Sequence, residues 1–264
     1  MIEKTLAIVL RTAPVSNTSR MVTWLTADHG KIATLIKGAQ RPKSPFLGQV
    51  DLFYTCELLF YVHARQHVHI ARECCALRRR DALRADWAAA AAASYCADVL
   101  MRVTLYEAPQ PALFALLELA LDHLAAEGAG EPFVYWFELK LLAALGLQPR
   151  LDACLDCGAA LLPAARPPVF AVARGGLVCA ACAARGAGGD PVAADALAVL
   201  AGWQASRNPR VARLTQCGPR QLAALEALLG RFLHTHLELR PASRALALDL
   251  LRRPSPRPGN GLPV

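Results

Sequence analysis

In the first eighty residues, apolar and polar positions alternate with a period of two, the pattern of half-buried β-strands. The first such run has its apolar positions at Leu6, Ile8 and Leu10. Two more runs, at 20–27 and 31–37, flank the turn sequence Asp28-His29-Gly30 and should form a hairpin. A fourth run covers 52–62, a tight turn is expected at 64–66, and a fifth run covers 68–77. Five short strands predict a closed barrel of the OB-fold type over residues 1–80.

From Asp81 onwards the apolar positions recur every three to four residues, which is the period of amphipathic helices. Prolines and glycines mark the expected helix ends. The expected helices run from 81 to a break at Pro109 and Pro111, then over 111–127, 132–145, 192–204, 219–239 and 242–252. We therefore predict a helical domain in two parts, 81–150 and 189–253, and a disordered tail over 254–264, which holds four prolines and two glycines.

A cysteine pattern separates the two helical parts. Two CxxC pairs, Cys154/Cys157 and Cys179/Cys182, stand 21 residues apart. Two such pairs supply four thiolates for a tetrahedral site that suits Zn²⁺, and the strand-like residues between them favour a zinc ribbon over 151–188. A redox pair or buried free thiols are the alternatives, but a redox CxxC needs no matching second pair. With four cysteine ligands the zinc would be structural.

Composition limits the class of protein. The chain has 264 residues, of which 55% are hydrophobic and 19% charged, and no apolar stretch is long enough to cross a membrane. The apolar run at 6–10 is too short for a signal-peptide core. We expect a soluble, cytoplasmic protein, in keeping with the five cysteines outside the two CxxC pairs, which suit a reducing compartment. The predicted fold class is α+β and multidomain: an OB-fold β-barrel, an α-helical domain and a zinc-ribbon insert with four cysteine ligands.

The net charge of +8 is distributed unevenly. Residues 1–80 carry +7, residues 81–153 carry −6, residues 154–189 carry +2, and residues 190–264 carry +5. Four of the five lysines lie in the first segment. Solvated charged faces are the ordinary explanation of any one charge run, but this distribution favours a surface for an acidic partner on the barrel.

A loop over 38–50, rich in proline and glycine, is long for a barrel connection and carries basic residues. Basic side chains on and beside such a loop suit binding to nucleic-acid phosphates without reading bases. The candidate DNA-binding residues are Arg11, Arg20, Lys31, Lys37, Arg41 and Lys43. Phe46 and Tyr61 are open candidates for base stacking, whereas Trp24 is expected in the core. The run Arg78-Arg79-Arg80 is either a phosphate contact or a solvated connector, and we favour the connector.

No catalytic centre is predicted, and the protein is not expected to be an enzyme. The acidic residues of the middle segment do not have the spacing of a paired-carboxylate metal site, which argues against a nuclease. They are expected on the solvated faces of helices: Asp81, Asp86, Asp98, Glu107, Glu118 and Asp122. His234 and His236 stand two apart, on different helix faces, and are expected at the surface or in capping positions.

Motifs spread in order along nearly the whole chain resemble one family. In the barrel they are Leu10-Arg11, Trp24-Leu25-Thr26, Gly30, Lys37-Gly38-Ala39, Arg41-Pro42-Lys43-Ser44 and Leu77-Arg78. Beyond it they are Phe137-Glu138-Leu139-Lys140-Leu141-Leu142, Gly146-Leu147, Pro149, Leu151, Cys154, Cys157-Gly158 and Arg240-Pro241-Ala242-Ser243-Arg244. Together they resemble the RecO family of recombination mediators and DNA-annealing proteins. One departure is Gln40, where relatives often carry a second basic residue.

The resemblance implies an OB-fold, a helical domain and a zinc ribbon, and no bond-breaking chemistry. It implies binding to single- and double-stranded DNA, annealing of complementary strands, and a place at the nucleoid. It also implies partnership with RecR and with the C-terminal tail of the single-stranded-DNA-binding protein, in loading the RecA recombinase. In the mechanism that we expect, the six basic residues hold phosphates of two strands at once and screen their repulsion. The alternative function is a zinc-ribbon nucleic-acid-binding accessory factor of transcription or translation.

Overall fold

The computed structural model describes residues 1–63, 68–161, 166–186 and 188–253. The turn expected at 64–66 and the tail expected at 254–264 lie outside these residues. The chain separates into two compact units. The first comprises Met1–Ala85 and Ala93–Glu127, and the second comprises Asp86–Ala92 and the described residues from Gly128 onwards. The predicted domain limits follow the type of secondary structure, whereas these units follow packing.

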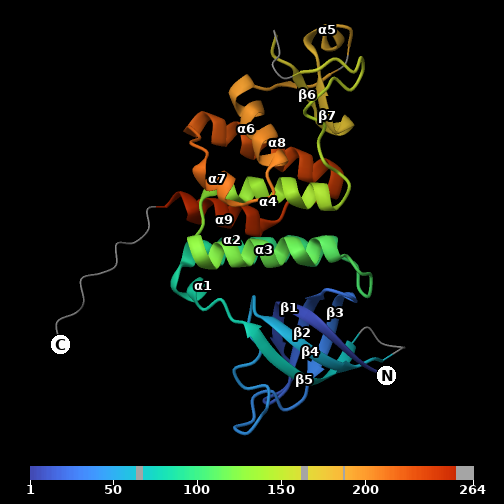
Figure 1. Ribbon diagram of the computed structural model, residues 1–264, viewed down its shortest axis with the longest axis vertical. Coiled ribbons are helices and arrows are strands. Elements are labelled where there is room, and N and C mark those ends of the chain that lie inside the picture. The colour runs from blue at the N-terminus through green and yellow to red at the C-terminus, as the bar shows by residue number, and fades with distance from the viewer. Residues whose placement is uncertain (64–67, 162–165, 187, 254–264) are drawn as a thin grey trace, which may run out of the picture. The chain divides into compact units, whose positions relative to one another are not determined.

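The first unit is built on a closed barrel of five strands in the order β1-β2-β3-β5-β4 (Figure 1). The strands are β1 (Ile2–Pro14), β2 (Arg20–Thr26), β3 (Gly30–Ile36), β4 (Thr55–Tyr61) and β5 (Val68–Arg78). Strand β1 pairs with both β2 and β4, and a register shift between Val9 and Arg11 helps it to curve between them. A short parallel pairing of β3 with β5 closes the barrel. The predicted OB-type barrel is confirmed.

The inward-facing residues of these strands form the barrel core. Val22, Trp24, Ile32 and Phe60 are fully or almost fully buried there. The indole N–H of Trp24 donates to the Thr34 hydroxyl at 2.8 Å, so this polar group is satisfied inside the barrel. Trp24 is therefore a core residue, as predicted.

Three helices follow the barrel: α1 (Ala82–Ala85), α2 (Trp87–Val103) and α3 (Pro111–Glu127). The prediction of one continuous helix from Asp81 is wrong. The Asp86 carboxylate accepts hydrogen bonds from the backbone N–H groups of Ala88 and Ala89, at 2.9 and 3.1 Å, and so caps a new helix. Helix α3 begins at Pro111 as predicted, because proline fits the first helical turn.

The second unit contains α4 (Glu131–Ala144), α6 (Ala194–Ala205), α7 (Arg210–Leu214), α8 (Pro219–Leu237) and α9 (Ala242–Arg252). Helix α4 is buried nearly all round and contacts the other four. Its Glu138 is fully buried and accepts two hydrogen bonds from Arg244 of α9, at 2.7 and 3.1 Å. This pairing satisfies a carboxylate that would otherwise be costly to bury. The short helix α7 was not predicted.

A small three-stranded sheet, in the order β7-β6-β8, lies in the same unit. Its elements are β6 (Val169–Ala171), the 3₁₀ turn η1 (Val172–Arg174), β7 (Gly176–Val178), α5 (Ala180–Ala183) and β8 (Asp190–Pro191). The ring of Phe170 packs on Phe232 of α8 at 5.9 Å, and His236 of α8 lies 2.7 Å from the Val172 carbonyl oxygen. The predicted β-ribbon is present and is anchored on α8. Within the described residues, no helix has the length and apolar character needed to span a bilayer.

Candidate nucleic-acid interface and metal site

Two neighbouring loops at one end of the barrel bring basic residues together. The loop before β2 and the loop after β3 are joined by a backbone hydrogen bond from Gln40 N–H to the Thr18 carbonyl, at 3.1 Å. Arg20 and Lys37 flank this junction, because Arg20 is paired with Ile36 across the two strands. Arg41 and Lys43 follow in the same loop and are exposed. We call Arg20, Lys37, Arg41 and Lys43 the basic rim.

Gln40 holds one member of the basic rim in place. With its amide oriented to satisfy both of its atoms, Gln40 accepts hydrogen bonds from the Arg20 guanidinium at 3.0 and 3.1 Å. Its amide nitrogen donates to the Asn17 carbonyl at 3.2 Å. Gln40 therefore links the two loops and orients an arginine. Sequence reasoning missed this role because Asn17 and Arg20 are brought to Gln40 only by the β2–β3 pairing.

The long loop of the rim is fixed on the barrel. Phe46 is only 8% exposed and belongs to the barrel core. The Gln49 side chain accepts a hydrogen bond from the backbone N–H of Ala76 on β5, at 2.9 Å. Phe46 is thus unavailable for base stacking, and that suggestion is corrected: the ring is needed to hold the loop. Tyr61 is 42% exposed, so it remains open for stacking.

Lys31 differs from the other predicted DNA-binding residues. It is 7% exposed, and its ammonium donates to the Met101 carbonyl at 2.6 Å and lies 4.6 Å from the centre of the Tyr106 ring. Burial lowers the pKa of Lys31. It also stands at the opposite end of β3 from Lys37, about 20 Å away along an extended strand. The structure therefore removes Lys31 from the candidate interface, because its charge is used inside the first unit.

Arg11 and the arginine run after β5 complete the predicted basic residues. Arg11 is exposed on β1, at the register shift. Arg78 and Arg80 both pair with Asp122 of α3, at 2.6 and 2.7 Å, and Arg80 also donates to the Phe53 carbonyl. These two arginines join the barrel to α3. They act as a connector, but not as the solvated one that we favoured, because the Arg80 side chain is only 3% exposed and is held in an ion pair.

The four predicted metal-binding cysteines come together in the ribbon. All four sulfur atoms lie within 4.8 Å of one another. The sulfurs of Cys157 and Cys179 are 3.8 Å apart, which is the separation of about 3.8 Å that tetrahedral Zn–S bonds of about 2.3 Å produce. In the described part of the chain, no other group of three or more histidine, cysteine or acidic side chains comes this close. The cluster has the donor set and spacing of a closed structural metal site.

Hydrogen bonds around the cluster favour thiolates. The Cys154 sulfur accepts from the backbone N–H groups of Asp156 and Cys179, at 3.4 and 3.3 Å. Burial raises the pKa of Cys154, but backbone hydrogen bonds from Cys157, Cys179 and Asp156 outweigh it and bring the pKa to about 6. Arg185 donates to the Cys182 sulfur at 3.0 Å, and so supplies positive charge beside the four sulfurs. Such contacts are what a metal site of net negative charge requires from its surroundings.

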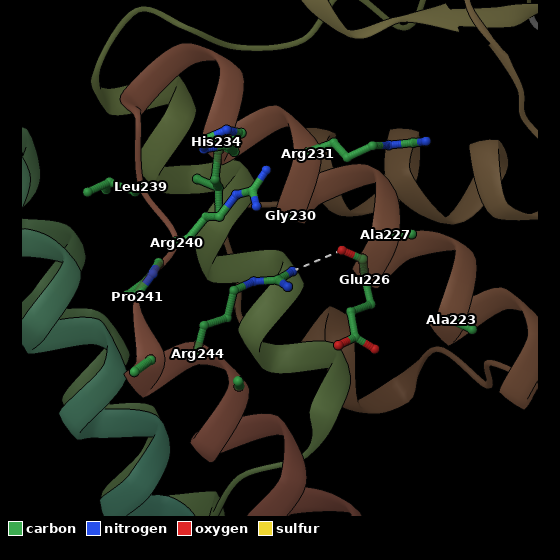
Figure 2. A pocket seen from close by; sticks show the side chains of 13 residues that line it. Ala223, Glu226, Ala227, Gly230, Arg231, His234, Leu239, Arg240, Pro241 and Arg244 are labelled. Atoms are coloured by element: carbon green, nitrogen blue, oxygen red, sulfur yellow. Dashed lines mark hydrogen bonds between the residues drawn. The ribbon is translucent and has the colours of Figure 1, made fainter.

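A groove of about 580 Å³ lies between α8 and the start of α9 (Figure 2). Its apolar wall comes from small side chains of α8 spaced three and four apart, Ala223, Ala227 and Gly230. Exposed Arg231 and Arg240 stand at its edge, and Arg244 donates to the Glu226 carbonyl at 3.2 Å. Sequence reasoning did not predict this groove, although the spacing of small residues is visible in the sequence. His234 also lines it and is exposed, as expected.

Comparison with known proteins adds a consistent result. The family model "Recombination protein O N terminal" matches residues 1–78, and "Recombination protein O C terminal" matches residues 84–245. The DNA repair protein RecO of Myxococcus xanthus is 35% identical over 240 residues, which are 88% of this chain and 91% of that one. The protein of the same name from Anaeromyxobacter sp. (strain K) is 34% identical over 91% of this chain and 94% of its own. That of Desulforudis audaxviator is 33% identical over 92% and 94%.

Proposed function

Because the chain belongs to the RecO family, whose relatives reported above are DNA repair proteins, we propose that it is a recombination mediator that anneals complementary single strands. It would also help to load the RecA recombinase on single-stranded DNA coated with its binding protein. The observation that carries this proposal is the basic rim. Between Asp28 and Asp51 the chain has no acidic residue. The rim gathers Lys37, Arg41 and Lys43 on one fixed loop, beside Arg20 at the start of β2.

The proposed mechanism is electrostatic. Phosphates of DNA strands bind the basic rim and release counterions, which lowers the repulsion between two strands and lets complementary bases meet. Arginine contributes a planar group with several donors that suits a phosphate, and Gln40 presents Arg20 in a fixed orientation. Arg11 adds charge on β1. None of these steps breaks a covalent bond, so the proposed activity is not enzymatic.

The partners are also proposals. Single- and double-stranded DNA, RecR and the acidic tail of the single-stranded-DNA-binding protein follow from family membership, as does a cytoplasmic place at the nucleoid. For the acidic tail, we propose the groove between α8 and α9. Its apolar wall would accept apolar side chains, and Arg240 at its edge would attract carboxylates, whereas Arg231 already pairs with Asp190 at 3.1 Å.

Zinc is proposed as the ion of the cysteine cluster. Cys154, Cys157, Cys179 and Cys182 supply four soft ligands at suitable distances, and zinc prefers such a tetrahedral sulfur site. When bound, the ion cross-links the two ends of the ribbon. The strands of the ribbon are only two or three residues long, so a cross-link of this kind stabilises its fold.

The proposal is tested by the double variant Lys37→Gln/Arg41→Gln. A matched control, Lys4→Gln/Arg72→Gln, removes the same charge from exposed residues of the same barrel. Fluorescence anisotropy with a labelled oligonucleotide should show at least about tenfold weaker binding for the rim variant, and a salt dependence reduced by about 1.4 in log–log slope. Annealing of complementary strands should slow in parallel. If the rim variant binds and anneals like the control, the basic rim is not the DNA site.

A further inference from the structure

A second arginine-rich surface lies in the other unit of the chain. Between Asp195 and Glu226 there is no acidic residue, and the basic residues of this stretch are all arginines: Arg207, Arg210, Arg213 and Arg220. All four are exposed. We call Arg207, Arg210 and Arg213 the α7 arginines, since they precede or belong to this short helix. They stand three residues apart, so Arg210 and Arg213 share one side of α7, next to Leu214, which is 78% exposed.

The backbone that carries the α7 arginines is firmly held. The indole N–H of Trp136 donates to the Ser206 carbonyl at 3.2 Å, just before the first of them. After the last, the indole N–H of Trp203 donates to the Thr215 hydroxyl at 2.9 Å, and that hydroxyl donates to the Val211 carbonyl at 2.6 Å. Ala212 faces inward and is buried. Exposed arginines on a rigid support lose less conformational entropy on binding a ligand than the same residues on a free loop.

The neighbourhood of Arg207 adds positive charge. Lys140 of α4 is half-buried, and its ammonium donates to the carbonyl oxygen of Gln204 at 2.6 Å. Burial lowers the pKa of Lys140, and the charge of Arg207 lowers it further, so the two cations repel each other. Among the residues that the structure describes, neither of these two cations is in an ion pair with a carboxylate. An anion bound here would relieve this repulsion.

We infer that the α7 arginines form a second surface for the phosphate backbone of nucleic acid, separate along the chain from the basic rim. The inference rests on the proposed function and deepens it, because annealing needs two strands on one protein. Three exposed arginines within one short segment suit a repeated anion such as a phosphodiester chain. An acidic peptide is less well suited, since the groove that would take its apolar side chains lies between α8 and α9.

The test compares two triple variants of the full-length protein. Arg207→Gln/Arg210→Gln/Arg213→Gln removes the α7 arginines. Arg150→Gln/Arg166→Gln/Arg253→Gln removes the same charge from other exposed positions of the unit and serves as the control. Circular dichroism first establishes that both variants are folded. The probes are two oligo(dT) strands, one labelled with a donor dye and the other with an acceptor dye. Because these strands cannot pair with each other, energy transfer between the dyes reports that one protein holds both strands. Anisotropy with one labelled strand measures binding of the first.

The α7 variant should bind one strand with an affinity within about twofold of that of wild type. Its energy transfer should fall about tenfold. The log–log slope of that signal against salt concentration should be smaller by about 2. Energy transfer equal to that of the control overturns the inference. The inference is also overturned if the α7 variant keeps its energy transfer but no longer binds a peptide rich in Asp and Glu. That result would indicate that the α7 arginines bind a protein partner. If the wild-type protein binds one strand but shows no energy transfer, the inference of a second surface is wrong and the proposed function is unaffected. If wild type binds no DNA, the proposed function fails as well.

Discussion

At the scale of single residues, two lysines six positions apart have different roles. Lys31 lies near the start of β3 and Lys37 directly follows its end, and both appear in the sequence as lysines of one strand beside a basic loop. The first is buried against Met101 and Tyr106, and the second is exposed in the basic rim. The difference comes from residues about seventy positions later in the chain, so no local pattern in the strand could have shown it.

These two lysines predict opposite consequences of the same substitution. Lys31→Ala should lower the free energy of unfolding by about 1–3 kcal/mol, because the Met101 carbonyl loses its donor and the Tyr106 ring loses a packing partner. Lys37→Ala should change stability by less than about 0.5 kcal/mol but weaken DNA binding. Urea denaturation and anisotropy on both variants check this. Equal effects of the two substitutions on DNA affinity would contradict the assignment of Lys31.

Glu131 predicts a pH dependence of stability. Burial raises the pKa of this carboxyl group, but hydrogen bonds from Arg252 and Tyr135 outweigh it, so the pKa is lowered overall. A lowered folded-state pKa means that the stabilisation is complete above the pKa of the unfolded chain and is lost as the pH falls through the folded value. Glu131→Gln should therefore be less stable than wild type by about 1–2 kcal/mol at pH 7. The difference in the free energy of unfolding between wild type and this variant should become smaller below about pH 4. Thermal melts across this range test it, and a gap independent of pH would refute the ionic origin.

At the scale of elements, the existence of strands and helices follows from the periodic sequence pattern. Where a helix starts or breaks depends on single side chains. The limits of α3 agree with prediction because Pro111 sets its start. The break between α1 and α2 escaped prediction because it depends on Asp86 capping the backbone within an otherwise continuous helical pattern. Helix α7 has only five residues, too short for a periodic signal. The ribbon was predictable because metal-ligand spacing is a local feature of the chain.

The ribbon also gives a prediction about metal removal. Cys157→Ser should lose bound zinc, with affinity weakened more than about 100-fold, because even indirect contacts to a metal are worth 10–100-fold. Cys75→Ser is the control, since Cys75 is also exposed but lies on β5. A zinc assay measures the loss of bound metal. Hydrogen exchange should become faster only over 151–191, while exchange in the barrel strands stays unchanged. An equal loss of protection in the barrel would show that the metal supports more than the ribbon.

At the scale of the whole molecule, the sequence predicted what is local or periodic. The five barrel strands, the helical regions and the four-cysteine site were all expected. The groove between α8 and α9, the role of Gln40 and the burial of Phe46 were not, because each depends on how separate elements pack against one another. The segment charges followed a similar rule. The positive charge of the first segment pointed to the barrel, but only the structure separates Lys31, which is buried, from Lys37, Arg41 and Lys43, which are exposed.

The buried pair of Glu138 and Arg244 has a consequence for the order in which the protein is made. The two residues are 106 positions apart in the chain. At about 5–20 residues per second, a ribosome needs on the order of 5–20 s to add the second after the first. During that interval the Glu138 carboxylate of α4 lacks the two hydrogen bonds that Arg244 donates to it. The helical unit therefore completes its packing only after synthesis of α9, whereas the strands of the barrel are already available for pairing when residue 78 has been made.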